Sequence, residues 1–282
     1  MAKKTPQDPT GMRYNRAKSI RQLSRRLSVA QLIVLNIVRS LPTRLKVNEY
    51  DYSLVTPQAL AETRRIITDV MYGQLETEED ETPFVWWFTP RIEQPYRQGA
   101  IEEVTELNRV LFDAVMAGSI LLTTIPVDTY LTTKVYRDGL QLVKSEVYHS
   151  IKSLGQRTAD QVMRVINDGI QAGISKQEIA RQVLERFEVS KSAAKRIVDT
   201  EVNKSYNDSR IRAIQTIRDE TGLNFMVEHI SALLPTTRKH HADRHHHIYT
   251  PSQQTAWWNK GANRISCHCS VRSVLNENTE GS

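Results

Sequence analysis

The sequence has almost no cysteine and no long apolar run. Cys267 and Cys269 are the only two cysteines among 282 residues, so a disulfide framework is excluded, and a bond across one intervening residue would be strained. This cysteine usage is typical of a reducing cytoplasm. The apolar stretch 27–38 is interrupted by Gln31 and Asn36. It is too short to cross a bilayer and lacks a small-residue cleavage site, so we expect neither a membrane span nor a secretory signal.

Internal repeats and low-complexity segments are also lacking. The composition is 39% hydrophobic and 25% charged, as in ordinary soluble globular proteins. At this length the chain can bury a real core. We therefore expect one large domain or two modest ones rather than a disordered chain.

The net charge of +6 is unevenly distributed. Only one acid, Asp8, lies in the first 26 residues, and residues 76–81 are strongly acidic. The basic residues of the N-terminal segment are Lys3, Lys4, Arg13, Arg16, Lys18, Arg21, Arg25 and Arg26. A basic arm is attracted to DNA, anionic lipid or an acidic protein face. We interpret these residues as binding DNA or a partner, with a solvated tail as the alternative.

Apolar periodicity and breakers predict a mainly helical chain. Helices are expected over 18–40, 56–72, 99–121, 132–172, 175–187 and 190–222, with a loop over 76–97 and strands within 223–230 and 265–275. The expected helix starts are Thr56-Pro57, Ser175 (with Glu178 as a capping box) and Ser190, and Gly222 is the expected C-terminal stop. The predicted fold class is mainly α with a small α+β C-terminal module, that is, an elongated helical body followed by a short-stranded, His/Cys-containing domain. The predicted regions are a basic flexible arm (1–17), an N-terminal helical region (18–130), a long-helix body (131–222) and the C-terminal module (223–282).

Residues 175–210 resemble a helix–turn–helix in outline. The predicted break at 188–190 precedes a basic second helix, which is the arrangement of a DNA-reading motif. The pattern has low specificity, because any two packed helices with a short loop share it. A DNA-binding protein of this kind is therefore kept only as an alternative.

Polar side chains follow one stripe of the last predicted helix. Thr200, Asn203, Asn207 and Arg210 are spaced three, four and three residues apart, so they share a helix face. They could form hydrogen bonds to another segment or to a ligand, or they could form an ordinary exposed face. The spacing does not decide between these alternatives.

Histidines and cysteines gather near the C-terminus. His240, His241, His245, His246 and His247 are followed some twenty residues later by Cys267-His268-Cys269. Thiolate and imidazole are the ligands that zinc prefers, and a small module gains stability from such a site. The candidate zinc ligands are Cys267, Cys269, His241 and His245. The alternative is two buried cysteines beneath a histidine-rich surface loop, since the cysteine spacing is shorter than zinc sites usually have.

A catalytic centre is the competing interpretation of the same residues. Cysteine with histidine can support covalent chemistry, and His241 with Glu201 could form a nuclease-like centre. No motif places a base or an oxyanion hole beside either cysteine, and residue types without geometry are weak evidence. We therefore predict no enzyme, and no catalytic residue is assigned.

Three blocks in a fixed order resemble the phage Mu F-like minor head protein family. They are Thr200–Arg210, Pro235–His245 and Tyr249–Cys269, and the resemblance covers roughly 150–275. The polar residues of this signature are Glu201, Asn203, Asn207, Arg210, Arg238, His241, Arg244, Asn263 and Arg264. Two positions depart from the family pattern. Thr236 replaces an Asp, and His246 replaces a Gly whose position can require a positive φ.

The resemblance implies a minor capsid protein of a tailed double-stranded DNA bacteriophage that acts in head morphogenesis. It implies partners among the portal, major capsid or scaffold proteins, with non-specific double-stranded DNA contact through the basic arm and no membrane or small-molecule substrate. The implied location is the virion, in the head interior or portal region, after assembly in the host cytoplasm. The implied role extends to DNA packaging or ejection. The only cofactor expected is the structural zinc that the His/Cys residues could bind. Related C-terminal modules occur in toxin-like proteins, which keeps a nuclease or toxin as the alternative.

Overall fold

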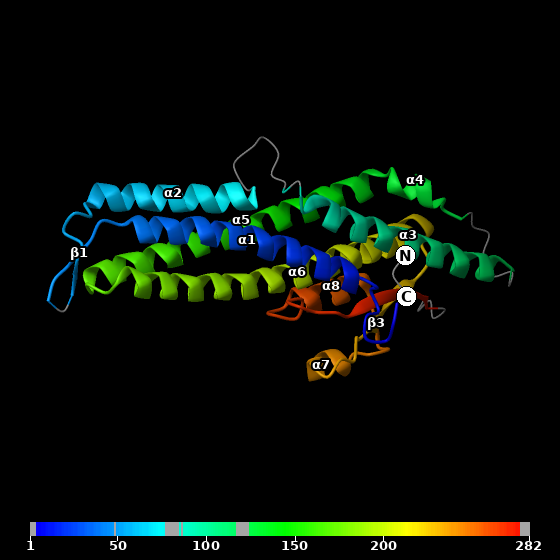
Figure 1. The fold of residues 1–282 in the computed structure, drawn as a ribbon. Coiled ribbons are helices and arrows are strands. Elements are labelled where there is room, and N and C mark those ends of the chain that lie inside the picture. Colours follow the sequence, from blue (N-terminus) through cyan, green and yellow to red (C-terminus); the bar gives the residue numbers. More distant parts are fainter. Residues whose placement is uncertain (1–3, 48, 77–84, 86, 117–123, 277–282) are drawn as a thin grey trace. The chain divides into compact units, whose positions relative to one another are not determined.

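The computed structural model describes residues 4–47, 49–76, 85, 87–116 and 124–276. These ranges contain eight helices and five short strands (Figure 1). The strands at the C-terminal end lie among short helices, so the predicted fold class, mainly α with a short-stranded His/Cys-containing module, is confirmed. Among the helices in these ranges, none combines the length and apolar character needed to span a membrane.

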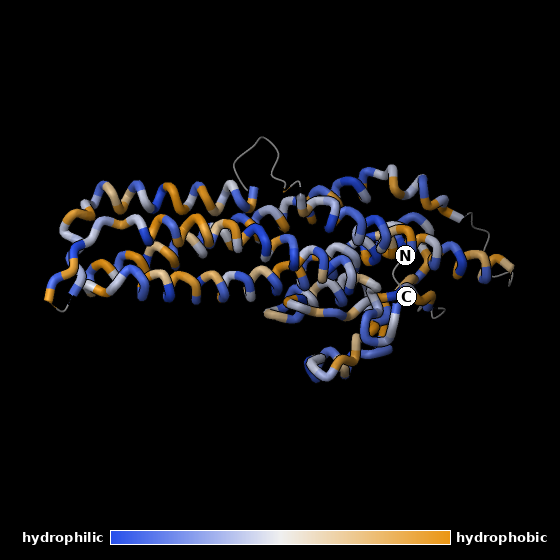
Figure 2. Tube along the Cα trace, in the orientation of Figure 1, coloured by the Kyte–Doolittle hydropathy of each residue, from blue (hydrophilic) through white to orange (hydrophobic). Residues whose placement is uncertain are grey.

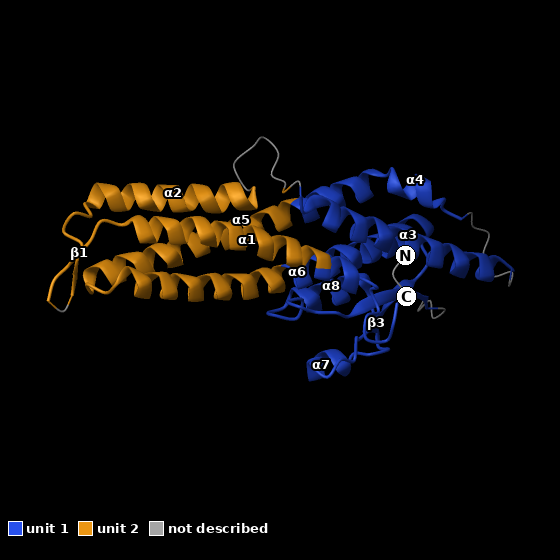
Figure 3. Ribbon diagram, viewed as in Figure 1, with its two compact units in different colours: residues 1–17, 87–144, 198–282 blue, residues 18–86, 145–197 orange. Residues whose placement is uncertain are grey.

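The chain divides into two compact units, each made of separate segments (Figure 3). Unit 1 comprises residues 1–17, 87–144 and 198–282, and unit 2 comprises residues 18–86 and 145–197. The four regions predicted from the sequence are linear, whereas both units are discontinuous. The reason is that α5 (Lys134–Gln171) and α6 (Lys176–Thr221) each contribute one part to each unit.

Unit 2 is built from helices with a small hairpin. It contains most of α1 (Arg13–Ser40), the strands β1 (Arg44–Leu45) and β2 (Tyr50–Asp51), and α2 (Pro57–Leu75). Thr56 caps α2 by accepting a hydrogen bond from the Ala59 amide at 3.2 Å, with Pro57 at the first helical position, as predicted. Hydrophobic and hydrophilic residues alternate in short bands along these helices (Figure 2). Fully buried members of this core are Leu23, Leu27, Val34, Ile67, Met71, Ile151, Ile166, Ile179, Val183 and Phe187.

Unit 1 carries the C-terminal module. It contains α3 (Thr89–Met116), α4 (Val127–Leu131), α7 (Lys239–Ala242) and α8 (Pro251–Asn259). Its antiparallel sheet has the order β4-β3-β5, formed by Ile248–Tyr249, Phe225–Ile230 and Ser270–Leu275. Gly99 of α3 lies against the backbone of Tyr206 on α6, where a Cβ would collide with the Tyr206 carbonyl oxygen. Only glycine permits this close approach of the two helices.

Three sequence predictions about elements are corrected. Helix α1 begins at Arg13 rather than at residue 18, and Met12, which precedes it, is fully buried. Residues 12–17, predicted to belong to a flexible arm, are therefore part of the folded structure. The predicted loop over 76–97 contains the start of α3 at Thr89, because a proline at the second position of α3 is compatible with its first turn. The predicted helix over 99–121 is part of α3, which ends at Met116; residues 117–121 lie outside the described residues.

The predicted helix–turn–helix is wrong, because α6 runs without a break from Lys176 to Thr221. Ser190, predicted to cap a second helix, instead lies inside α6. Its hydroxyl donates to the Arg186 carbonyl at 2.9 Å and accepts a hydrogen bond from Thr158 at 2.9 Å. Back-bonding of this kind lets serine occupy a helix interior. Two end signals are confirmed: Ser175 accepts from the Glu178 amide at 3.1 Å, and Gly222, with φ 70°, follows the last residue of α6.

Candidate functional site

The polar stripe of α6 is bonded to the segment that carries the cysteines. Thr200 Oγ1 accepts from the Ser266 amide at 3.0 Å, Asn203 Nδ2 donates to the Cys267 carbonyl at 2.8 Å, and Asn207 Nδ2 donates to the Cys269 carbonyl at 3.0 Å. Seven helical residues advance about 10 Å, as do three extended residues. Residues 200–207 and residues 266–269 therefore match in length. The polar stripe forms its hydrogen bonds with this other segment of the chain rather than with solvent.

Asn203 also joins the N-terminal segment to this arrangement. Its Oδ1 accepts from Arg16 Nη1 at 2.7 Å and from Thr10 Oγ1 at 3.3 Å. Arg16 is only 6% exposed and pairs with Asp8 at 3.4 Å. Burial lowers the pKa of Arg16, while the charges of Asp8 and Asp199 oppose this shift. Arg16, predicted as part of a binding arm, is thus a buried structural residue.

Arg210 ends the stripe in a buried ion pair with Glu103 of α3. Arg210 is 5% exposed and Glu103 is fully buried. Burial would lower the pKa of Arg210, but the charge of Glu103, together with Tyr206 and Glu102, outweighs burial and raises the pKa. Glu103 Oε1 also accepts from the Ser273 amide on β5 at 3.0 Å. Glu103 was missed, although an acid beside Ala100, Val104 and Leu107 on the apolar face of a helix was a signal for a buried partner.

The other signature arginines also bind within the chain. Arg238 donates to the carbonyls of Ala262, Asn263 and Ile265 at 2.5, 2.9 and 3.1 Å. Arg264 pairs with Asp208. Arg244 lies over the Tyr249 and Trp257 rings, with its guanidinium carbon 3.6 and 4.2 Å from their centroids, and donates to Gln254 at 3.1 Å.

Two further signature residues are Asn263 and Glu201. Asn263 donates to the Trp257 carbonyl at 2.9 Å and contacts His240 Nε2 at 3.0 Å. Glu201 is 8% exposed. His246, which replaces the family's glycine, has φ 64°, so the expectation that this position needs a positive φ is confirmed.

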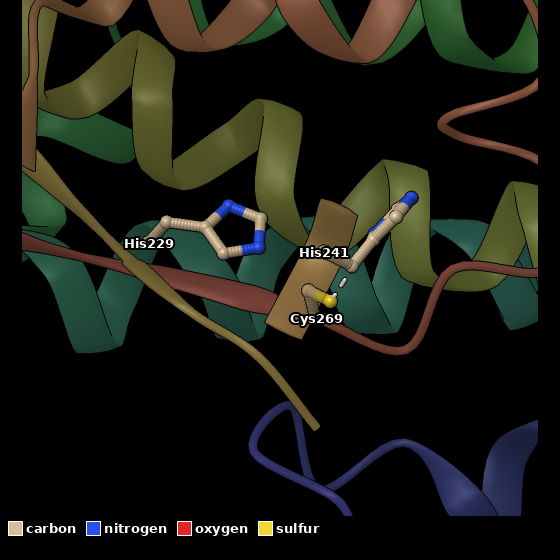
Figure 4. A group of neighbouring side chains, drawn as sticks. All are labelled: His229, His241 and Cys269. Carbon is tan, nitrogen blue, oxygen red and sulfur yellow. Dashed lines mark hydrogen bonds between the residues drawn. The ribbon is translucent and has the colours of Figure 1, made fainter. Parts of the chain in front are cut away.

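Three of the four predicted zinc ligands come together. His241 Nδ1 lies 3.5 Å from Cys267 Sγ and 3.6 Å from Cys269 Sγ. Figure 4 shows His241 and Cys269 with a third residue, His229 of β3, and the ligand atoms of these three lie within 4.8 Å of one another. The fourth predicted ligand, His245, instead accepts from the Ser231 amide through Nδ1 at 3.2 Å. His229 was missed because it lies in a strand, apart from the histidine-rich segment.

The residues of this cluster are buried, and the pKa values of its two thiols are shifted in opposite directions. His229, His241 and Cys269 are at most 2% exposed and Cys267 is 7% exposed. The hydrogen bond between the two thiols raises the pKa of Cys267, as does burial. The same hydrogen bond lowers the pKa of Cys269, and the two nearby imidazoles add to this lowering. An adjoining cavity of about 60 Å³, lined in part by His241, Cys267 and Cys269, has room for about two water molecules.

The predicted basic residues are divided between ion pairs and an exposed face. Lys4 pairs with Glu102 at 2.5 Å and Arg26 with Glu76 at 2.7 Å, while Lys3 lies outside the described residues. Apart from the buried Arg16, which pairs with Asp8, the remaining four are exposed and form no ion pair within the described part of the chain. They are Arg13, Lys18, Arg21 and Arg25.

Comparison with known proteins identifies the region that contains this site. Residues 160–272 match the family described as Phage Mu protein F like protein. No curated protein and no solved structure matches the chain. The matched range is less than half of the chain but includes the α6 stripe, the arginine contacts and the His/Cys cluster. Over residues 160–272 the chain is therefore similar to the Phage Mu protein F like family, and this similarity supports a phage head morphogenesis protein.

Proposed function

We propose that the chain is a non-catalytic minor component of the phage head that acts at the portal or inner capsid. Its role lies in head assembly and in DNA packaging or ejection. One observation carries the proposal: the polar signature residues of α6 form hydrogen bonds and an ion pair inside unit 1. Side chains used in this way build a stable module rather than act on a substrate.

The geometry gives little support to the nuclease or toxin alternative. His241 is 2% exposed and Glu201 is 8% exposed. The cavity beside His241 is about 60 Å³, whereas small-molecule sites are commonly about 300–1,000 Å³. A catalytic role predicts that Glu201→Ala abolishes an activity while particle assembly stays normal. The proposed structural role predicts no such separation.

The exposed basic face of α1, in unit 2, is the surface that we propose contacts DNA. Lys18, Arg21 and Arg25 are spaced three and four residues apart and are exposed, so they lie along one side of α1. Such a row suits non-specific contact with phosphates or with an acidic capsid surface. It carries no means of reading a base sequence.

Charge reversal tests this face. We expect Lys18→Glu, Arg21→Glu and Arg25→Glu together to weaken binding to double-stranded DNA and to reduce the slope of log K against log salt by about 2.7, or about 0.9 for each lost phosphate contact. The matched control reverses three exposed and separated residues, Arg186, Lys195 and Lys260, with the same change in net charge. Equal losses in both triple variants would show a general charge effect and contradict a binding face on α1.

Complementation tests the role in the head. A phage that lacks the chain should lyse its host but yield few infectious particles, and the wild-type chain supplied in trans should restore the yield. The yield with the α1 triple variant should fall below that with the scattered control if the face acts during assembly or packaging. Full infectivity without the chain would contradict the proposal.

A further inference from the structure

The His/Cys cluster combines two features that together point to a ligand. Its four side chains come from three elements: His229 from β3, His241 from α7, and Cys267 and Cys269 from the segment before β5. All four are buried. In addition, the buried Nε2 of His229 has no hydrogen-bond partner among the described residues, although buried polar atoms are normally satisfied.

The distances from His241 to the two cysteines fit tetrahedral zinc. Bonds of about 2.3 Å to sulfur and about 2.0–2.1 Å to nitrogen place sulfur and nitrogen ligands about 3.6 Å apart. His241 Nδ1 lies 3.5 Å from Cys267 Sγ and 3.6 Å from Cys269 Sγ. The single residue between the cysteines is fewer than zinc sites usually have, but here both sulfurs reach the same nitrogen.

The surroundings hold these ligands in place. The carbonyls of Cys267 and Cys269 are bound by Asn203 and Asn207 of α6 at 2.8 and 3.0 Å. His229 Nδ1 contacts the Gln254 amide at 3.1 Å, which leaves Nε2 as the nitrogen for a metal. A metal-bound Nε2 leaves Nδ1 protonated, and a half-turn of the Gln254 amide lets its oxygen accept a hydrogen bond from Nδ1 in exchange for the one it accepts from Arg244. Contacts of this kind orient metal ligands in proteins.

We propose that Cys267, Cys269, His241 and His229 form a structural zinc site that joins β3, α7 and the segment before β5. This site goes beyond the proposed head function and does not depend on it. It replaces His245 of the sequence prediction with His229. Two thiolates and two imidazoles without an open position are characteristic of a structural rather than a catalytic zinc site. The site would stabilise a module whose sheet has only three short strands.

Zinc content tests the site directly. The full-length protein is purified without a histidine tag, and zinc is quantified by inductively coupled plasma mass spectrometry. We expect about one zinc per wild-type chain and per His245→Gln chain, and strong loss of zinc in Cys269→Ser and His229→Gln. Loss of zinc from His245→Gln with retention in His229→Gln would overturn this ligand set. A folded wild-type chain that binds no zinc would overturn the site.

Cobalt provides a test that needs no variant. The wild-type chain is stripped with a chelator, refolded and titrated with Co²⁺ alone. Tetrahedral coordination by two thiolates predicts thiolate-to-cobalt charge-transfer absorption in the near ultraviolet and intense visible d–d bands. Addition of Zn²⁺ should then remove both signals, because zinc binds such sites more tightly. Weak d–d bands without charge transfer, as in octahedral oxygen coordination, would overturn the proposal.

Discussion

At the scale of single residues, Asn203 connects three segments of unit 1. Its side chain accepts from Arg16 and Thr10 of the N-terminal segment and donates to the Cys267 carbonyl, and it is 2% exposed. An amide suits this position because it offers an acceptor on one side and a donor on the other. Asp would lose the donor, and an apolar residue would leave the Arg16 guanidinium without its nearest acceptor.

Asn203→Ala should therefore lower the free energy of unfolding by about 2–4 kcal/mol, because buried groups on both sides lose their partners. Urea denaturation followed by circular dichroism measures the change. Ser192→Ala is the control, since Ser192 is an exposed residue of the same helix and should change stability by less than about 0.5 kcal/mol. Equal stability of the two variants would show that the Asn203 contacts contribute little.

Glu102 gives unit 1 a dependence on pH. Burial raises the pKa of its carboxyl group, but hydrogen bonds from Lys4, Tyr206 and Gln98 outweigh burial and lower the pKa below the ordinary value of 4.5. A carboxyl group with a lowered folded-state pKa stabilises the fold above its unfolded pKa, and this contribution is lost as the pH falls through the folded pKa.

Wild type should thus exceed Glu102→Gln in stability by about 1.5–3 kcal/mol near neutral pH, the range for hydrogen bonds to a charged group. This difference should shrink as the pH falls below 4.5. Thermal unfolding of both proteins across this pH range provides the measurement. A difference that is constant with pH would assign the effect of the substitution to packing rather than to the charge of Glu102.

At the scale of elements, the continuity of α6 decides between a structural helix and a DNA-reading motif. Val189 lies at the predicted break and is 51% exposed, so replacing it changes the backbone more than the packing. Val189→Pro should cost about 3 kcal/mol or more, because proline removes a helical hydrogen bond and collides with the preceding turn. Val189→Ala is the control. A melting temperature unchanged by the proline would indicate a real turn at 188–190.

Capping residues, a C-terminal glycine and apolar alternation in the sequence predicted where several helices and strands lie. Thr56-Pro57 marked the start of α2, Gly222 the end of α6, and residues 223–230 contained β3. The break at 188–190 was predicted wrongly because the hydroxyl of Ser190 is satisfied by Thr158, a partner 32 residues away. Contacts between distant segments are not encoded in local spacing.

The same limit applies to the site. The helical spacing of Thr200, Asn203 and Asn207 predicted a shared face, and only the fold identified residues 266–269 as what that face binds. Cys267, Cys269 and His241 were chosen correctly as neighbours by residue type. His229 could not be chosen in this way, because its approach to Cys269 depends on the pairing of β3 with β5.

At the scale of the whole molecule, the Mu F-like region and the exposed basic face of α1 belong to different parts of the sequence. The family match covers 160–272, whereas Lys18, Arg21 and Arg25 lie outside it. The two features therefore make separate contributions to the proposed role: the first provides a stable module, and the second provides a surface for a polyanion. Variants of each can be tested separately.

The most direct test of the proposed role is the amount of this chain in phage particles. Mature virions and empty precursor heads are purified and the chain is quantified in both by mass spectrometry against the major capsid protein. We predict a low and fixed copy number in precursor heads, retained in virions if the chain stays at the portal and reduced if it leaves during packaging. Absence from both particles would contradict a role as a head component.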